Sequence, residues 1–229
     1  MRIAALFSGG KDSTFALYWA IKKGHEVKCL MTLSPKRKDS YMFHFPNIEF
    51  AKYQAGAMGI PILTASTSGE KEKELEDLIR IIKKAKKKYR IEGVAAGAVA
   101  SEYQKTRVEK ICSNLGLECL APYWKANPEE YMKSIIDSGF EVIITGVYAE
   151  GLLPEMLGQR IDSKMLDKLI QLNKKYKIHI AGEGGEYETF VADAPIFKKR
   201  IVIEKAEKVM ETKSTGYLRI MKVRLEKKI

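Results

Sequence analysis

Strand-like and helix-like segments alternate through residues 1–121, and this rhythm constrains the fold more than any other feature of the chain. Apolar runs rich in strand-forming residues lie at 2–7, 26–33, 62–65, 93–99 and 117–121. Segments with helical spacing separate them, at 13–23, 47–58, 71–90 and 101–115. Such an alternation specifies a parallel sheet with helices on both faces. We therefore predict a doubly wound α/β domain over residues 1–121.

Two of these helices begin with a capping signal. Asn47 is expected to cap the second helix, because a side-chain oxygen at this position accepts a hydrogen bond from the first turn. Ser101 and Gln104 form a capping box at the start of the fourth helix.

The rhythm changes after Pro122-Tyr123-Trp124. Helices are expected at 128–138 and 164–176, and strands at 142–147, 178–181, 187–191, 200–209 and 217–225. Helices followed by a run of strands indicate a smaller α+β domain. We predict this second domain over residues 122–229, packed closely on the first.

The composition is that of an ordinary soluble globular protein rather than a membrane protein. The chain has 229 residues, of which 45% are hydrophobic and 30% charged. No apolar run approaches the ~18–20 residues of a membrane helix. The apolar start of the chain is too short and too soon followed by glycines and charges to be a signal peptide, so a cytoplasmic protein is expected.

The net charge of +11 and the 3 cysteines are weaker guides. Much of the charge lies in residues 71–90, whose apolar positions recur at helical spacing, so a solvated helix face is favoured over a nucleic-acid surface. Cys29, Cys112 and Cys119 form no C-x-x-C pair, and neither a zinc site nor a disulfide is expected. The oligomeric state is left open, a homo-oligomer included.

The segment Ser8-Gly9-Gly10-Lys11-Asp12-Ser13 lies between the first strand and the first helix. Glycines allow a tight turn that aims backbone N–H groups at an anion, and a helix N-terminus favours the same anion. The lysine adds a positive charge and the serines add hydroxyl donors. The aspartate suits this place if it meets Mg²⁺ or caps the helix. The alternative is a glycine turn with no ligand. The Walker spacing G-x-x-x-x-G-K-[ST] is absent.

This hexapeptide resembles the signature of the PP-loop ATP pyrophosphatases. The resemblance implies cleavage of ATP between the α- and β-phosphates, with AMP left on the substrate. It also implies that residues 8–13 hold the pyrophosphate portion, with Mg²⁺ and Asp12 assisting.

Two further stretches carry residues suited to a site. Residues 97–109, GAVASEYQKTRVE, place Tyr103 and Arg107 four apart on one helix face, beside the carboxyl edge of the sheet. Taken alone, this stretch is explained fully by a capped amphipathic helix, which is the favoured interpretation. Residues 182–189, GEGGEYET, combine glycines with carboxylates; the alternatives are a surface turn and a loop held near a cation. Carboxylates close together raise one another's pKa, which favours a proton acceptor for ammonia.

The three stretches together resemble the diphthine–ammonia ligases. The resemblance rests on residues 8–13, 97–109 and 182–197, and it extends to 157–160 and 122–124, so it covers essentially the whole chain. It implies ATP-dependent amidation of diphthine, a modified histidine of translation elongation factor 2, through an adenylated carboxylate. Ammonium is the implied nitrogen source, and neither a membrane nor a nucleic acid is an expected partner.

The candidate residues follow from these motifs and the resemblance. ATP-binding roles fall to Ser8, Gly9, Gly10, Lys11, Asp12, Ser13 and Gly97, with Asp12 also the candidate magnesium ligand. Catalytic roles fall to Lys11, Glu183, Glu186 and Glu188. Substrate-binding roles fall to Ser101, Tyr103, Gln104, Arg107, Gly184, Gly185 and Tyr187. Tyr187 and the three glutamates are implied for the trimethylammonium group of diphthine, which aromatic rings and carboxylates bind well.

Two other functions fit parts of the pattern. A PP-loop enzyme that modifies tRNA, of the thiolation or lysidine type, suits the positive charge, but it is disfavoured by the absence of paired cysteines and by the 182–189 stretch. A nucleotide-sensing protein without chemistry would share the sheet, but such proteins generally lack the adjacent lysine and aspartate of the loop.

Overall fold

The computed structural model describes residues 1–35, 47–67, 71–97 and 102–228. Its first half is a parallel sheet in the order β3-β2-β1-β4-β5. The strands are β1 (Arg2–Leu6), β2 (Glu26–Pro35), β3 (Ile62–Thr67), β4 (Gly93–Ala95) and β5 (Glu118–Leu120). The predicted doubly wound sheet is confirmed.

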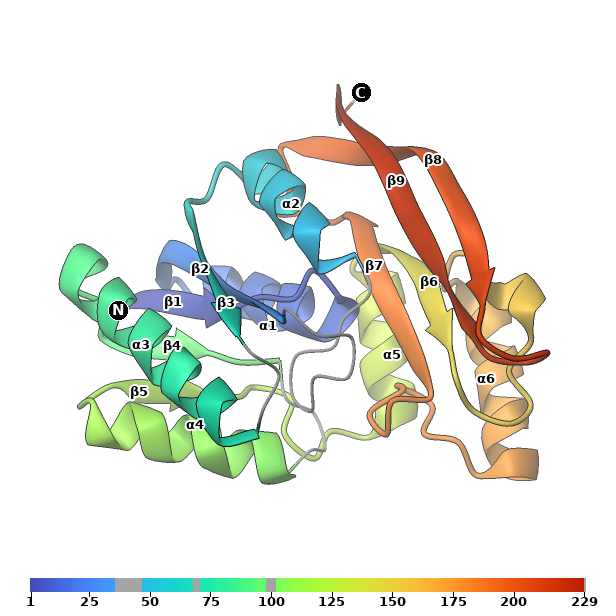
Figure 1. Ribbon diagram of the computed structural model, residues 1–229, viewed down its shortest axis with the longest axis horizontal. Coiled ribbons are helices and arrows are strands. Elements are labelled where there is room, and N and C mark those ends of the chain that lie inside the picture. The colour runs from blue at the N-terminus through green and yellow to red at the C-terminus, as the bar shows by residue number, and fades with distance from the viewer. Residues whose placement is uncertain (36–46, 68–70, 98–101, 229) are drawn as a thin grey trace.

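Helices cover both faces of this sheet because its strands alternate their side chains between two cores (Figure 1). Ile3 and Ala5 of β1 face one core, with α1 (Lys11–Lys22) and α2 (Ala51–Met58). Ala4 faces the other, with α3 (Lys71–Tyr89) and α4 (Glu102–Asn114).

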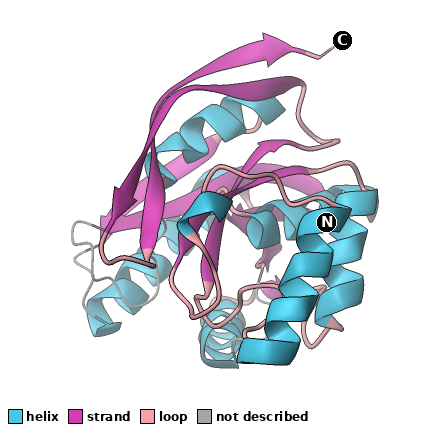
Figure 2. Cartoon of the chain, turned by 90° about the vertical axis from the view of Figure 1, so that its right-hand side faces the viewer, coloured by secondary structure: helices cyan, strands magenta, loops and turns pink. Residues whose placement is uncertain are grey.

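The second half contains an antiparallel sheet in the order β7-β6-β9-β8. Its strands are β6 (Glu141–Val147), β7 (Tyr187–Asp193), β8 (Lys199–Met210) and β9 (Gly216–Lys227), and its helices are α5 (Pro128–Asp137) and α6 (Ser163–Tyr176). Figure 2 shows the two longest strands, β8 and β9, side by side, and they are antiparallel. Two short 3-10 helices, η1 (Ile48–Phe50) and η2 (Pro154–Met156), complete the described elements.

The larger core joins the two halves. Phe15 of α1 stacks on Tyr123, with ring centroids 4.7 Å apart, and meets Phe140 edge-on at 5.4 Å. All three rings belong to one cluster that also contains buried residues of β6, β7 and β9. The two halves are therefore packed through a shared apolar interior, while the division at residues 121 and 122 stays a prediction.

Three local predictions differ from the structure. Asn47 does not cap a helix: its backbone is left-handed (φ 68°), and its side chain instead donates to the Leu218 carbonyl and accepts from the Ile220 amide, at 2.9 and 2.7 Å. The side-chain amide of Asn47 therefore links β9 to the first half of the chain by two hydrogen bonds. Residues 178–181 form a turn rather than a strand, because the chain must reverse between α6 and β7. The strand expected at 93–99 is described only over Gly93–Ala95.

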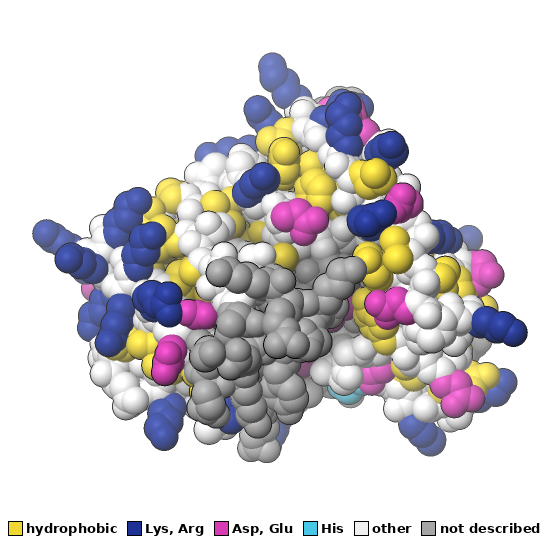
Figure 3. Space-filling view, in the orientation of Figure 1, with side chains coloured by type: hydrophobic (Ala, Val, Ile, Leu, Met, Phe, Trp, Pro, Cys, Tyr) yellow, Lys and Arg dark blue, Asp and Glu magenta, His cyan; other side chains and the backbone are white. Residues whose placement is uncertain are grey.

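The basic helix α3 has the amphipathic form that its spacing predicts. Leu78, Ile82 and Ala85 are fully buried, and the lysines of its last turns are exposed. Figure 3 shows Lys and Arg side chains spread over this end of the molecule rather than gathered into one groove. No helix among the described residues is long and apolar enough to cross a membrane.

Candidate active site

The loop between β1 and α1 is closed by its two serines. The hydroxyls of Ser8 and Ser13 lie 3.2 Å apart, and the Ser13 hydroxyl also accepts from the Ser8 amide at 3.2 Å. Gly9 has φ +84°, a left-handed conformation that suits glycine. Gly10 is the N-cap of α1 and has no side chain to occupy the helix end. The loop thus presents a helix N-terminus and two hydroxyl groups at one point.

This point is the switch point of the sheet, where ligands of open α/β folds bind. β1 lies between β2 and β4, so the chain leaves it with neighbours on both sides. Gly97, just after β4, packs directly on the start of α1: a Cβ at this position would lie 2.5 Å from the Asp12 carbonyl carbon and 2.6 Å from the Ser13 nitrogen. Gly97 is therefore in contact with the loop of residues 8–13, which we call the phosphate loop. This contact follows from its place at the end of the neighbouring strand.

Lys11 and Asp12 form a charge pair at the base of the loop, in which the lysine is buried and the aspartate is partly exposed. Lys11 is 3% exposed, and its Nζ lies 2.9 Å from Asp12 Oδ2 and 5.4 Å from the centre of the Tyr187 ring. Burial lowers the pKa of Lys11, but the nearby Asp12, Tyr187 and Glu183 outweigh it and leave this pKa raised. Lys11 is therefore a fixed cation. Asp12 is held from its other side by the Tyr131 hydroxyl, which donates to Oδ1 at 2.9 Å.

Strand β7 of the second half completes the loop. The Val191 amide donates to the Gly9 carbonyl at 3.0 Å, and the Lys11 amide donates to the Thr189 hydroxyl at 3.1 Å. The Gln54 side chain of α2 bridges both, donating to the carbonyls of Gly9 and Val191 at 2.8 Å each. The edge of the second sheet is thereby bound to the loop that carries Lys11.

The glycine–glutamate stretch is a turn that leads directly into β7. Gly182 and Gly185 have positive φ, at 70° and 81°. The Glu186 carboxylate accepts from the His179 and Gly184 amides, at 2.8 Å each, and so holds the turn closed. The Tyr187 side chain is buried and donates to the Ile180 carbonyl at 2.7 Å. Through these contacts, Glu186 and Tyr187 stabilise the turn at the base of the site.

Glu188 lies in the same strand, and its environment alters its acidity. Burial raises its pKa to about 8; Lys11 opposes this shift, whereas Asp12 and Glu183 add to it. A carboxyl with this pKa exchanges its proton near neutrality, as an acid–base group must. Glu183 lies near the same part of the site, since it also raises the pKa values of Lys11 and Tyr131.

The candidates on α4 are described only in part. Ser101 and the side chains of Tyr103 and Gln104 lie outside the described residues, and Arg107 is partly buried. Their substrate-binding roles stay predictions.

Four contacting residues were not among the candidates. Gln54 and Tyr131 each lie in a helix whose sequence gives no sign of a site, and Thr189 stands within the third motif but was not singled out. His179 is the fourth: burial lowers its pKa, and its Nδ1 accepts from the Ala181 amide at 3.2 Å. The only available signal was a polar residue in an apolar context, as at Gln54.

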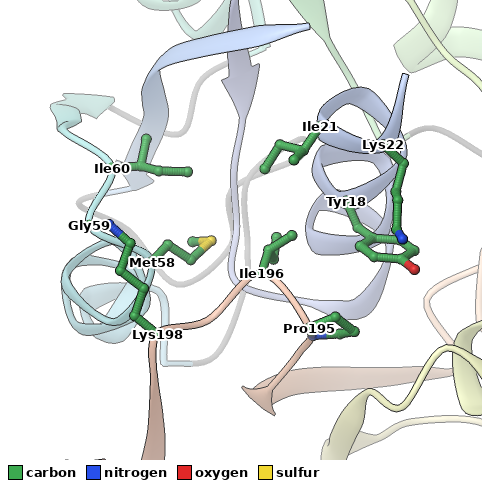
Figure 4. Close-up of a pocket in the computed structure, with 9 residues that line it drawn as sticks. All are labelled: Tyr18, Ile21, Lys22, Met58, Gly59, Ile60, Pro195, Ile196 and Lys198. Carbon is green, nitrogen blue, oxygen red and sulfur yellow. The ribbon is translucent and has the colours of Figure 1, made fainter. Parts of the chain in front are cut away.

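A separate pocket lies at the C-terminal end of α1, the end opposite to the loop (Figure 4). Its volume is ≈ 500 Å³, and Tyr18, Ile21, Met58, Ile196 and Lys198 are among its lining residues. It shares no residue with the phosphate loop or the glycine–glutamate turn, so we do not assign the reaction to it.

The donor set at the loop fits a triphosphate. It combines a helix N-terminus, two serine hydroxyls and a lysine that stays charged. Magnesium would need phosphate oxygens as further ligands beside Asp12, as is usual for this ion. Within the described ranges, no group of three or more His, Cys, Asp or Glu residues could hold a metal alone.

Two family models match the chain in succession. The diphthamide synthase N-terminal domain matches residues 1–119, and the diphthamide synthase C-terminal domain matches residues 127–225.

The chain is also similar over its whole length to curated proteins named diphthine–ammonia ligase. The mouse protein is 38% identical and the human protein 37% identical over 252 residues, which cover 100% of this chain and 94% of each relative. The zebrafish protein is 36% identical over 250 residues, which cover 100% of this chain and 98% of that protein. A solved structure described as a predicted subunit of tRNA methyltransferase from Methanocaldococcus jannaschii aligns with a TM-score of 0.42 and 14% identity, over 85% of this chain and 98% of that one.

Proposed function

Since the chain belongs to the diphthamide synthase family of diphthine–ammonia ligases, we propose that it converts diphthine on translation elongation factor 2 to diphthamide. The reaction is an ATP-dependent amidation: the diphthine carboxylate is adenylated with release of pyrophosphate, and ammonia then displaces AMP. A cytoplasmic location belongs to the same proposal.

One observation carries this proposal: hydrogen bonds join β7 to the phosphate loop. The family-specific turn leads into β7, and β7 contacts the loop through Val191 and Thr189. A carboxylate bound along β7 would therefore lie beside the phosphates that react with it, which is the arrangement that adenylation needs.

In this proposal, the residues of the phosphate loop bind ATP. Ser8, Gly9, Gly10, Ser13 and Gly97 would shape and supply the donors for the phosphates. Lys11 would neutralise the charge that develops on the departing pyrophosphate, because its own charge is fixed by its carboxylate neighbours. Asp12 would hold Mg²⁺ against the phosphate oxygens.

The second-half residues have the amide-forming part. Glu188 is our preferred acceptor for the proton that ammonium loses, with Glu183 beside it, because its pKa of about 8 suits exchange near neutrality. Glu186, Gly184 and Gly185 would shape the turn. Binding of the protein substrate is proposed for four residues at and before the start of α4: Ser101, Tyr103, Gln104 and Arg107.

The test is direct reconstitution. Purified protein, ATP, ammonium and elongation factor 2 carrying diphthine should yield the amide by mass spectrometry, together with equimolar AMP. Omission of ammonium should stop the amide. A second arm replaces the factor with unmodified tRNA. AMP release stimulated by tRNA alone would favour a tRNA-modifying enzyme and would overturn the proposal.

A further inference from the structure

Gly146, Glu188 and Tyr217 lie side by side across three strands of the second sheet. Gly146 of β6 is paired with Glu188 of β7 on one side and with Tyr217 of β9 on the other. Residues paired in this way point to the same face of a sheet. Their neighbours Val147 and Tyr187 are buried in the shared core and define the opposite face. Glu188 and Tyr217 therefore project from the face that the core does not cover.

The ring of Tyr148 lies against Gly146, and Glu188 and Tyr217 are both close enough to act on the pKa of its hydroxyl. A Cβ on Gly146 would lie 2.6 Å from Tyr148 Cε2 and 2.8 Å from its hydroxyl oxygen, so a glycine at this position leaves room for the ring. The Tyr148 amide donates to the Glu186 carbonyl at 2.8 Å, which fixes the ring beside the glycine–glutamate turn. Tyr148, Glu188 and Tyr217 are all only partly buried.

This surface carries two carboxyl groups, those of Glu188 and Glu211, and lies close to the phosphate loop. Burial raises the pKa of Tyr148, and Glu188, Glu211 and Tyr217 raise it further, which places both carboxylates in electrostatic reach of the ring. Lys11 in turn acts on Glu188.

We propose that Tyr148, Tyr217 and Glu188 form the binding site for the quaternary ammonium group of the substrate. Aromatic ring faces attract such cations, which have no N–H to donate, and a carboxylate supplies the balancing charge. This proposal rests on the proposed function, because diphthine carries the trimethylammonium group. It replaces Tyr187 in that role: the Tyr187 ring is buried, its hydroxyl is bonded to Ile180, and its cationic neighbour is Lys11.

The site also explains how Glu188 could serve amidation. A cation bound against Glu188 favours its ionised form. The ionised form is the one that can take a proton from ammonium, so the same substrate group that is recognised would prepare the acceptor.

The experiment compares two substitutions at one position. Tyr148→Leu removes the ring and keeps an apolar side chain, whereas Tyr148→Phe keeps the ring. We expect the KM for diphthine-bearing elongation factor 2 to rise about tenfold in Tyr148→Leu and Tyr217→Leu and to stay within about twofold in Tyr148→Phe. The KM for ATP should not change in any of them. Tyr53→Leu, on the outer side of α2 where Tyr53 is 36% exposed, is the matched control.

A binding measurement separates this proposal from the proposed function. Choline and its uncharged isostere 3,3-dimethylbutan-1-ol are titrated into the full-length protein by calorimetry. Binding of choline alone, lost in Tyr148→Leu and kept in Tyr148→Phe, supports the cation site even if wild-type protein makes no amide. Equal binding of both probes, or choline binding that survives Tyr148→Leu, overturns it.

Discussion

Lys11 is the residue on which ATP cleavage should depend most. It is buried, charged and held by Asp12, so it cannot be replaced by a solvent cation. We expect Lys11→Ala to lower AMP formation by at least about 100-fold, the usual cost of losing a preorganised charge at a transition state. The measurement is AMP release by chromatography, with circular dichroism to confirm the fold.

The control for Lys11 is Lys22→Ala. Lys22 lies at the other end of α1 and lines the separate pocket. It should release AMP at the wild-type rate. Normal AMP release by Lys11→Ala would remove the loop from the mechanism.

Glu188 should set the pH dependence of amide formation. Its folded pKa is raised to about 8, so the carboxyl is largely protonated at neutral pH and becomes an acceptor as the pH rises. Below this pKa, kcat/KM for amidation should fall about tenfold for each pH unit. Glu188→Gln should lose this dependence and keep only the part that comes from the titration of ammonium itself. Identical profiles for the two proteins would exclude Glu188 as the acceptor.

At the scale of elements, the side chain of Gln54 connects α2 to the loop and to β7 through hydrogen bonds. Its Nε2 serves two carbonyls from distant parts of the chain, and both lose this donor in Gln54→Leu. We expect a loss of about 1–3 kcal/mol in the free energy of unfolding, the cost of unsatisfied buried groups. Denaturant unfolding measures it. Gln171→Leu, at an exposed position of α6, should change stability by less than about 0.5 kcal/mol.

The turn before β7 should depend on Glu186 in a similar way. The carboxylate accepts two backbone amides with its two oxygens, and a glutamine retains only one acceptor oxygen. Glu186→Gln should therefore reduce amide yield at least about tenfold through a displaced β7, with a smaller effect on the KM for ATP. Full amide yield from this variant would show that the turn is not needed.

The helices and strands of the first half could be predicted because each is specified locally. Strand-forming runs, helical spacing and glycine stops lie within a few residues of one another, and the phosphate loop is a contiguous hexapeptide. Asn47 misled the prediction because the residue type is a good cap, while the structure gives its side chain to β9, far along the chain.

The assembly of the site could not be predicted, because it depends on contacts between residues that are far apart in the sequence. Gln54, Tyr131 and Thr189 reach the loop through tertiary contacts that leave no periodicity. The row of Glu188, Gly146 and Tyr217 depends on the register of three strands and on a bulge between Ile144 and Gly146. A one-residue change of register would send these side chains to the other face.

For the whole molecule, the shared core has a thermodynamic signature. Buried residues of α1 and α2 form one cluster with those of α5, α6 and the antiparallel sheet. We expect a single cooperative unfolding transition in differential scanning calorimetry, with equal calorimetric and van't Hoff enthalpies. Two resolved transitions would show that residues 1–121 and 122–229 are energetically independent.

The hydrogen bond from Val191 to Gly9 also limits how such a molecule can evolve. A loop that only held a nucleotide could be passed between enzymes as a module and joined to any partner domain. Here the strand that carries the side chains we propose for the substrate also forms a hydrogen bond with the loop we propose for ATP. On that proposal, a mutation on either side of this hydrogen bond would affect the binding of both substrates. The two halves can change only in step, and a chimera that gives this loop a foreign second half would begin with an incomplete nucleotide site.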